Sequence, residues 1–385
     1  MIDFKPANLT EVYPQLPFVP ICGQGVFLQD NDGSQVLDLY GGHAVASLGY
    51  GHPKLIEAIK KQAQSLLFQS NIVEICIRNE AAEKLAEFSP ECLTRVFFIN
   101  SGSEANENAL RIALQMTSRT KIVAVEHSFH GRTGAAAAVT WGAKKSWYGF
   151  PHTPFNVQFV RRNDVQALHK AIDKDTAGVI IEPVQGVAGA FDFSKEFLTT
   201  ARSLCDQHGA LLILDEVQTG VGRLGKPFGS DYFDVKPDML TTAKALGGGF
   251  PCGALLMTQD IAVELKPGDL GSTFGGGPLA CAAIKAVLEV IEEEDLLTQV
   301  QNIGSLIQNK CITGPVIGIQ GAGFLLGLKV KPKASLIRDD LLKKGILTGT
   351  SADPHVLRLL PPYILEEKHV NLLIEALQEF KSETL

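Results

Sequence analysis

One stretch of the chain, residues 210–257, carries an apolar run that ends in charged side chains. The run at 211–214 reads Leu-Leu-Ile-Leu and predicts a strand that is buried on both faces. Asp215 and Glu216 follow it directly. Because ligands of open α/β sheets bind beyond the carboxyl ends of the strands, we expect Asp215 to face a ligand.

Further along the same stretch, Lys244 stands among small apolar residues, before a glycine run at 247–249 and an apolar strand at 254–257. Burial lowers the pKa of an ammonium group and makes such a lysine a candidate imine-forming nucleophile. Pyridoxal phosphate chemistry needs this lysine, and an acid such as Asp215 to pair with the ring nitrogen. A salt-bridged aspartate and a surface lysine remain an alternative on these residues alone.

Strands and amphipathic helices alternate on both sides of this stretch. The pattern predicts strands at 96–99, 122–126, 157–160 and 178–182, and helices at 54–67, 78–88, 105–116, 165–172 and 279–293. This alternation across 96–257 indicates an α/β fold with a mostly parallel sheet.

The two ends of the chain have a different pattern. Residues 1–22 contain four prolines and predict an extended arm, and a turn at Asp32-Gly33 predicts a hairpin. The tail from 294 has the make-up of a smaller α+β domain, with helices expected at 298–310, 336–344 and 368–381 and strands at 323–330 and 356–360.

A second candidate site follows the strand at 96–99. Residues 100–106 read Asn-Ser-Gly-Ser-Glu-Ala-Asn and lead into a helix. A strand, a turn of small residues and a helix N-terminus form an anion site, to which Ser101 and Ser103 add hydroxyl donors. The alternative is that Ser103 only caps the helix, with Asn106 at the third helical position.

Three further segments carry candidate binding residues. Phe129 and Arg132, close together in the sequence, are suited to stack on a ring and to grip a carboxylate, although core packing and a surface charge are the commoner roles. Residues 271–278 place serine and threonine hydroxyls before a helix. Arg358 interrupts an apolar strand, and an arginine in such a place usually meets a carboxylate.

Composition and charge argue against several classes of partner and binding site. The 385 residues are enough for two domains, and a net charge of −7 without a basic run makes nucleic acid an unexpected partner. Seven scattered cysteines without a C-x-x-C pair predict reduced thiols and no metal site. No apolar run suits a membrane span or a leader, so we expect a cytoplasmic protein. The glycine pattern at 220–225 lacks the strand–turn–helix context of a dinucleotide site.

Taken together, these segments resemble the class III pyridoxal-phosphate-dependent aminotransferases of fold type I, and within them the acetylornithine and N-succinylornithine aminotransferases. The matching motifs, in chain order, are GQGVFLQDNDGSQVLDLYGGHAV, NSGSEANE, FHGRT, IEPVQG, LDEVQTGVGRLG, TTAKALGGGFPCGA, GSTFGGGP and LRLLPP.

This resemblance implies a large domain (51–277) with a mostly parallel seven-stranded sheet and a small α+β domain (278–385) to which the N-terminal arm and hairpin (1–50) contribute. It also implies a homodimer with shared active sites. The implied reaction moves the terminal amino group of the acylornithine to 2-oxoglutarate, giving the N-acyl glutamate semialdehyde and glutamate, in arginine biosynthesis.

The resemblance also implies roles for individual residues. Lys244 holds the cofactor as a Schiff base and then moves the substrate proton, and Asp215 keeps the pyridine nitrogen protonated. Arg132 and Ser272 contact the acylornithine, and Arg358 takes the substrate α-carboxylate. The full set of implied cofactor contacts is Ser101, Gly102, Ser103, Phe129, Asp215, Glu216, Val217, Gln218, Lys244 and, across the dimer, Thr273.

Three positions depart from the family pattern. Val187 replaces a glutamate that pairs with the arginine at position 358 in ornithine-type relatives, which leaves open how this arginine is held and mildly favours an acylated substrate. Gly277 replaces an asparagine and Tyr50 a histidine. Transaminases for ornithine, succinyldiaminopimelate or 4-aminobutyrate remain alternatives, followed by a glutamate-semialdehyde aminomutase and a non-catalytic relative.

Overall fold

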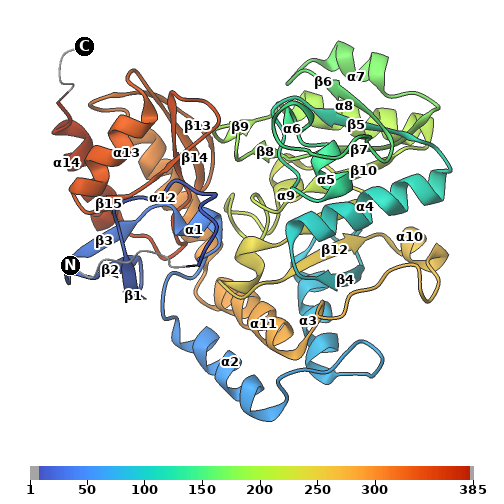
Figure 1. Ribbon diagram of the computed structural model, residues 1–385, viewed down its shortest axis with the longest axis horizontal. Helices are drawn as coiled ribbons and strands as arrows, with labels where there is room; N and C mark the ends of the chain where they lie inside the picture. The colour runs from blue at the N-terminus through green and yellow to red at the C-terminus, as the bar shows by residue number, and fades with distance from the viewer. Residues whose placement is uncertain (1–7, 382–385) are drawn as a thin grey trace.

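The computed structural model describes residues 8–381 and is built around a seven-stranded sheet (Figure 1). Its strands lie in the order β4-β12-β11-β10-β7-β5-β6, and only β12 runs antiparallel to its neighbours. The predicted α/β class with a mostly parallel seven-stranded sheet is therefore confirmed. The strands are β4 (Arg95–Ile99), β5 (Lys121–Val125), β6 (Asn156–Val160), β7 (Thr176–Ile181), β10 (Leu211–Asp215), β11 (Met239–Thr242) and β12 (Gly253–Met257).

Both faces of this sheet are covered, which explains its uninterrupted apolar strands. Leu212 and Leu214 of β10 point into one core, together with α8 (Lys195–His208) and α7 (Val165–Ala171). Ile213, between them, points into the opposite core with α4 (Gly102–Thr117). The segments that connect or follow the strands of this sheet also contain four short α-helices: α5 (Gly134–Ala138), α6 (Ala143–Ser146), α9 (Gly229–Phe233) and α10 (Gln259–Glu264).

A second, smaller body of the structure is built from elements at both ends of the chain. Strands β1 (Pro20–Gln24), β2 (Phe27–Asp30) and β3 (Gln35–Asp38) pair with β15 (Ile346–Leu347), so the blue N-terminal hairpin lies beside the red C-terminal elements in Figure 1. The other elements here are α12 (Leu296–Lys310), β13 (Val316–Ala322), β14 (Leu325–Val330), α13 (Ala334–Lys343), β16 (Gly349–Thr350), β17 (Val356–Leu359) and α14 (Glu367–Gln378).

One long helix connects the two bodies. Helix α11 (Pro278–Glu293) packs against α2 (Pro53–Ser65) and α3 (Cys76–Phe88), which precede the central sheet in the sequence, and leads into α12. The three-part division at residues 50 and 277 stays a proposal. Within it, α11 is a linking helix that packs on the large domain.

Most predicted elements form within a few residues of the expected bounds. The sequence pattern predicts neither the short elements α5, α6, α9, α10, β15 and β16 nor four further features. These are β11, β13, α8 and the small hairpin of β8 (Val184–Gln185) and β9 (Phe191–Asp192). β11 is short and its four residues are all buried, so it shows no alternation of apolar and polar positions that would reveal it. The extended arm predicted for 1–22 lies partly outside the described residues.

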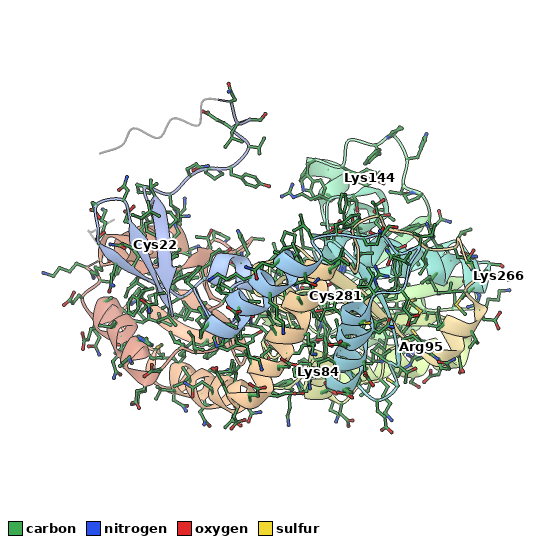
Figure 2. All side chains as sticks on the ribbon, turned by 90° about the horizontal axis from the view of Figure 1, so that it is seen from below. Cys22, Lys84, Arg95, Lys144, Lys266 and Cys281 are labelled. Carbon is green, nitrogen blue, oxygen red and sulfur yellow. The ribbon has the colours of Figure 1, made fainter. Side chains whose placement is uncertain are left out.

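The cysteines within residues 8–381 form no disulfide, although Cys252 and Cys281 lie in the same core cluster. All seven are free thiols, and Figure 2 shows Cys22 on the N-terminal hairpin and Cys281 in α11, in separate parts of the molecule. Across residues 8–381 there is no helix long and apolar enough to cross a membrane, and no cluster of side chains suited to hold a metal ion.

Candidate active site

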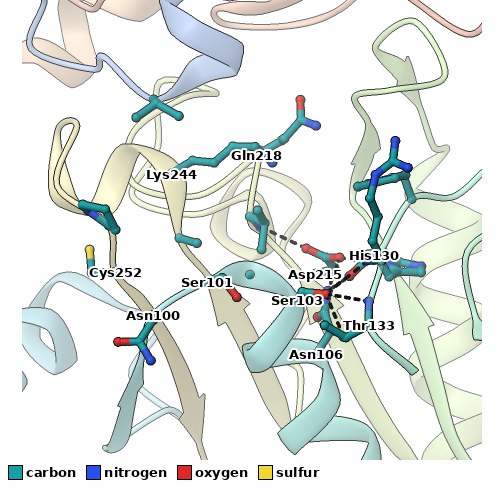
Figure 3. Close-up of a pocket in the computed structure, with 18 of the residues that line it drawn as sticks. Asn100, Ser101, Ser103, Asn106, His130, Thr133, Asp215, Gln218, Lys244 and Cys252 are labelled. Carbon is teal, nitrogen blue, oxygen red and sulfur yellow. Dashed lines mark hydrogen bonds and ion pairs between the residues drawn. The ribbon is translucent and has the colours of Figure 1, made fainter. Parts of the chain in front are cut away.

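A cavity of about 530 Å³ lies where the carboxyl ends of β10 and β11 meet the N-terminus of α4 (Figure 3). The carboxyl ends of these two parallel strands are adjacent, with Asp215 opposite Thr241. The cavity brings together most of the predicted site residues: Ser101, Gly102, Ser103, Phe129, Arg132, Asp215, Val217, Gln218 and Lys244.

Lys244 begins the short 3-10 helix η1 (Lys244–Gly247), just beyond the end of β11. Its backbone has a φ of 47°, a left-handed conformation that costs a non-glycine residue about 1 kcal/mol or more. Burial lowers the pKa of the ammonium group to about 8, against the opposing charges of Asp215 and Glu182. The strained turn therefore places an amine that is easily deprotonated inside the cavity.

Asp215 is 3% exposed and is held by three donors. Its Oδ2 accepts from the Asn106 amide at 2.8 Å and contacts His130 Nδ1 at 2.7 Å, and its Oδ1 accepts from the Val217 N–H at 3.1 Å. Thr241 in turn donates to Asn106 Oδ1 at 2.7 Å. A carboxylate fixed in this way is oriented before any ligand arrives.

The N-terminus of α4 has the geometry of the predicted anion site, with its first turn in the cavity wall. Ser101 is the N-cap, with its hydroxyl accepting from the Glu104 N–H at 3.2 Å. The alternative in which Ser103 caps the helix with Asn106 at its third position is therefore wrong. Ser103 Oγ instead contacts Thr133 Oγ1 at 2.9 Å, beside the cavity.

Glycine is required at position 102. A Cβ there would lie 2.6 Å from a methyl carbon of Val217, so any side chain would push the first turn of α4 away from the strand ends. The open backbone N–H groups of this turn and the nearby hydroxyls suit a phosphate group.

Aromatic and amide side chains form the rest of the wall. The Phe129 N–H donates to Glu182 Oε1 at 2.8 Å, which anchors the segment that carries the ring. The Arg132 guanidinium lies over Trp147, with 4.8 Å to the ring centroid. Gln218 Oε1 is buried without a hydrogen-bond partner among the described residues, as expected for an atom that meets a bound cofactor.

Four predicted residues do not line this cavity: Glu216, Ser272, Thr273 and Arg358. Glu216 points into the protein interior, where its carboxylate accepts from the Ser230 N–H at 2.7 Å and from Gly229, and burial raises its pKa to about 7. Ser272 accepts from the Gly275 N–H at 2.9 Å, and Thr273 is exposed. Glu216 is thus a structural residue here, because the side chain after Asp215 leaves the strand on the other side.

Arg358 lies close enough to Lys244 for its positive charge to lower the lysine pKa. It is 5% exposed and donates to the carbonyl oxygens of Thr350 at 2.8 Å and Gly186 at 3.1 Å, and to Tyr40 Oη at 2.7 Å. The expected carboxylate partner is absent: no acidic side chain within residues 8–381 forms an ion pair with it.

Several residues of the site escaped the sequence analysis. Asn106 and His130 orient Asp215, Glu182 lines the cavity with its pKa raised to about 7 by burial, and Tyr40 contacts Arg358. Asn106 gave a usable signal, because it is a polar residue on the apolar face of a predicted helix. The others depend on contacts between distant segments.

Comparison with known proteins identifies the family. The sequence profile of the family "Aminotransferase class-III" matches residues 10–380. The chain belongs to this family. It is 40% identical to the acetylornithine aminotransferase of Methanocaldococcus jannaschii across 99% of this chain and 98% of that protein. It is 38% identical to the acetylornithine aminotransferase of Aquifex aeolicus across 95% of this chain and 98% of that protein.

Solved structures agree with this assignment. The ornithine aminotransferase of Toxoplasma gondii ME49 superposes with a TM-score of 0.90 at 28% identity, covering 96% of this chain and 91% of that one. An S-selective transaminase from Arthrobacter superposes with a TM-score of 0.87 at 26% identity, covering 94% and 92%. The protein is therefore a pyridoxal-phosphate-dependent aminotransferase of fold type I.

Proposed function

We propose that this aminotransferase moves the terminal amino group of N-acetylornithine or N-succinylornithine to 2-oxoglutarate, in arginine biosynthesis. Curated relatives at 36–40% identity over nearly the whole chain carry the name acetylornithine aminotransferase. The observation that carries the chemistry is one cavity that contains both Lys244, with its lowered pKa, and the fixed carboxylate of Asp215.

The residues around the cavity fit pyridoxal phosphate. The first turn of α4, with Ser101 to Ser103, would hold the phosphate, Phe129 would stack on the ring, and Gln218 would bond to the ring hydroxyl through its unpartnered oxygen. When bound, the cofactor supplies an aldehyde for the amino group and a pyridine ring that accepts electrons.

Two residues of the chain then handle protons. Asp215, oriented by Asn106 and His130, would hold a proton on the ring nitrogen. Lys244 Nζ would take and return the proton at the substrate carbon that carries the amino group, since a pKa of about 8 allows both protonation states near neutral pH.

Two cationic side chains are the proposed substrate contacts: Arg132 lines the cavity, and Arg358 lies outside its lining but near enough to Lys244 to lower the lysine pKa. Arg132 would contact the acylornithine and Arg358 the substrate α-carboxylate, so that glutamate and an acylated amino acid share one pocket. Ser272 would support the acyl end through the 271–275 loop, to which the Asn71 amide donates.

We further propose that the enzyme is a cytoplasmic homodimer. The exposed Thr273 precedes Phe274, which is 65% exposed and packs beside Phe68, and Leu67 is 61% exposed nearby. These side chains line an apolar groove that also includes Asn100 and Phe250, next to the active-site cavity. Support for the dimer is that a second subunit would cover this groove and bring Thr273 to the partner's phosphate site.

A coupled assay with 2-oxoglutarate tests the reaction. We expect kcat/KM for N-acetylornithine or N-succinylornithine to exceed that for free ornithine by at least about a hundredfold, because the latter leaves acyl contacts unmade. A preference for free ornithine would contradict the proposed substrate and leave the cofactor chemistry in place.

A further inference from the structure

Arg358 is a buried cation that forms no ion pair within residues 8–381, although the charge of Glu182 lies near enough to oppose the lowering of its pKa by burial. Its three protein partners, the carbonyls of Gly186 and Thr350 and the hydroxyl of Tyr40, are all neutral. A buried cation without a direct ion-pair partner is costly, so neutral groups must hold the guanidinium in place.

The hydrogen bonds at Arg358 have a fixed direction. A guanidinium can only donate, so Tyr40 Oη accepts from Arg358 Nη2. Burial raises the pKa of the Tyr40 hydroxyl, which therefore keeps its single hydrogen, and this hydrogen lies toward His43 Nδ1 at 2.8 Å. His43 must then accept at Nδ1 as a neutral ring. This agrees with its lowered pKa, which comes from partial desolvation of the ring and from the charges of Arg358 and Lys244.

The backbone that presents Tyr40 and His43 is strained. Four residues in succession have positive φ values: Gly41 (55°), Gly42 (57°), His43 (65°) and Ala44 (68°). A left-handed backbone costs about 1–2 kcal/mol for each residue with a Cβ, and such strain persists where the surroundings enforce it, most often at functional sites.

The surroundings enforce this turn from several sides. Asp38 Oδ1 accepts from the N–H groups of Tyr40 at 2.7 Å and Gly41 at 2.9 Å, and Tyr50 donates to the other carboxylate oxygen. Arg223 of the 220–225 segment donates to the carbonyl oxygen of Ala44 at 3.4 Å. The departure from the family pattern at Tyr50 thus serves the turn.

The ring of Tyr40 is also held against the strand that carries Arg358. It covers Gly349, which pairs with Arg358 across β16 and β17, and a side chain at Gly349 would collide with the ring. The guanidinium lies 5.4 Å from the ring centroid. Three of the five N–H groups of Arg358 are used by its partners, so one hydrogen on Nη1 and one on Nη2 remain for a carboxylate.

We propose that Tyr40 and His43 are positioning residues that hold Arg358 as a ready carboxylate fork. The inference rests on the proposed function, in which Arg358 receives the substrate carboxylate. Because the neutral hydroxyl and carbonyls do not compete as a bound carboxylate does, glutamate binds without first breaking an ion pair.

Binding of glutarate to the holoenzyme tests this proposal without turnover, since this five-carbon dicarboxylate has neither an amino nor a keto group. We expect Tyr40→Phe to raise the glutarate Kd by calorimetry about tenfold, the loss typical of one hydrogen bond to a charged group. The KM for glutamate should rise by a similar factor, with kcat changed less than about twofold. Tyr148→Phe, which removes a hydroxyl bonded to the Gly134 carbonyl, is the matched control and should bind like the wild type.

A second variant covers the case in which Tyr40→Phe does not fold. His43→Asn keeps a residue that tolerates positive φ but is too short to reach the hydroxyl, and we expect about a threefold rise in the glutarate Kd. Wild-type affinity in the folded Tyr40 and His43 variants, or a loss of kcat with unchanged KM, would overturn the proposal.

Arg358→Lys distinguishes a failure of the proposed function of Arg358 from a failure of the positioning role of Tyr40 and His43. If this variant binds glutarate like the wild type, the proposed function of Arg358 fails, and the positioning role fails with it. If it binds at least about a hundredfold more weakly while Tyr40→Phe and His43→Asn match the wild type, only the positioning role fails.

Discussion

At the scale of single residues, the site depends on side chains whose charge is set by burial. Lys244 has its pKa lowered to about 8, whereas Glu182 and Glu216 have theirs raised to about 7. Glu182 lines the cavity and Glu216 does not, although Glu216 directly follows Asp215. Burial therefore shifts the pKa of side chains that line the cavity, and equally that of a glutamate in the protein interior.

The lysine pKa makes a prediction for cofactor loading. Only a neutral amine attacks the aldehyde of pyridoxal phosphate, and a lowered pKa makes this form available above pH 8. The rate of loading of the apoenzyme should rise about tenfold per pH unit below pH 8 and level off above it. Stopped-flow absorbance measures this rate, with Lys244→Arg as a control that forms no adduct. A rate that does not change with pH below 8 would contradict the assignment.

Glu216 makes a prediction for stability. Its carboxylate binds two backbone N–H groups, so Glu216→Gln should lower the free energy of unfolding by about 2 kcal/mol and leave the KM for 2-oxoglutarate within about twofold. Because its folded pKa is raised from 4.5 to about 7, the native state holds the extra proton between these values. Wild-type stability should fall as the pH rises through this window, and less so in the variant. Urea titrations between pH 4.5 and 7 measure the stability of the wild type and of the variant. A large change in the KM for 2-oxoglutarate would indicate that Glu216 contacts the cofactor after all.

At the scale of elements, the close approach of a helix start to a strand end forms the wall of the proposed anion site. The first turn of α4 can approach the end of β10 only because Gly102 has no Cβ to meet Val217. Ser101 completes the turn as the N-cap, which leaves Ser103 free to face the cavity. The small residues of this turn therefore serve two purposes. Ser101 caps the helix, and Gly102 and Ser103 leave the cavity accessible to a ligand.

Gly102→Ala tests this close approach. The added methyl group would force the turn away from Val217, and we expect the Kd for pyridoxal phosphate to rise about tenfold or more, because overpacking costs roughly 1–3 kcal/mol. Absorbance titration of the apoenzyme measures the affinity. The double variant Gly102→Ala with Val217→Ala should recover most of it, since the second change removes the clashing methyl carbons. Failure of this rescue would show that the clash is not the cause.

At the scale of the whole molecule, the site lies where the sheet, the linking helix and the small body meet. Tyr40 comes from the N-terminal segment, Lys244 from the central sheet and Arg358 from β17. The apolar groove lies beside the cavity, on the face that the proposed second subunit would cover.

The groove gives a prediction for assembly. Ultracentrifugation should find a particle of twice 41.5 kDa. Phe274→Asp should shift the protein toward the monomer, because a charge in a buried apolar contact costs several kcal/mol, and should weaken pyridoxal phosphate binding at the same time. Tyr232→Asp, on an exposed aromatic residue outside the groove, is the control. A Phe274→Asp protein that stays dimeric would exclude this face as the interface.

The sequence by itself determined the α/β class and most elements, and it identified the candidate residues of the proposed cofactor site. Buried parallel strands are uninterrupted apolar runs, and catalytic residues follow their ends, so Asp215, Lys244 and the turn at 100–103 are visible as local patterns. It could not separate Glu216 from the site, because the direction of a side chain after a strand end depends on the turn that follows.

Only the tertiary structure decided how Arg358 is held. Tyr40 stands 318 positions away from it, and no spacing in the chain signals that their side chains meet. The same holds for His130 and Asp215, which are 85 positions apart. Local patterns record the preferences of neighbouring residues, whereas contacts of this kind arise from packing between segments that only the folded chain brings together.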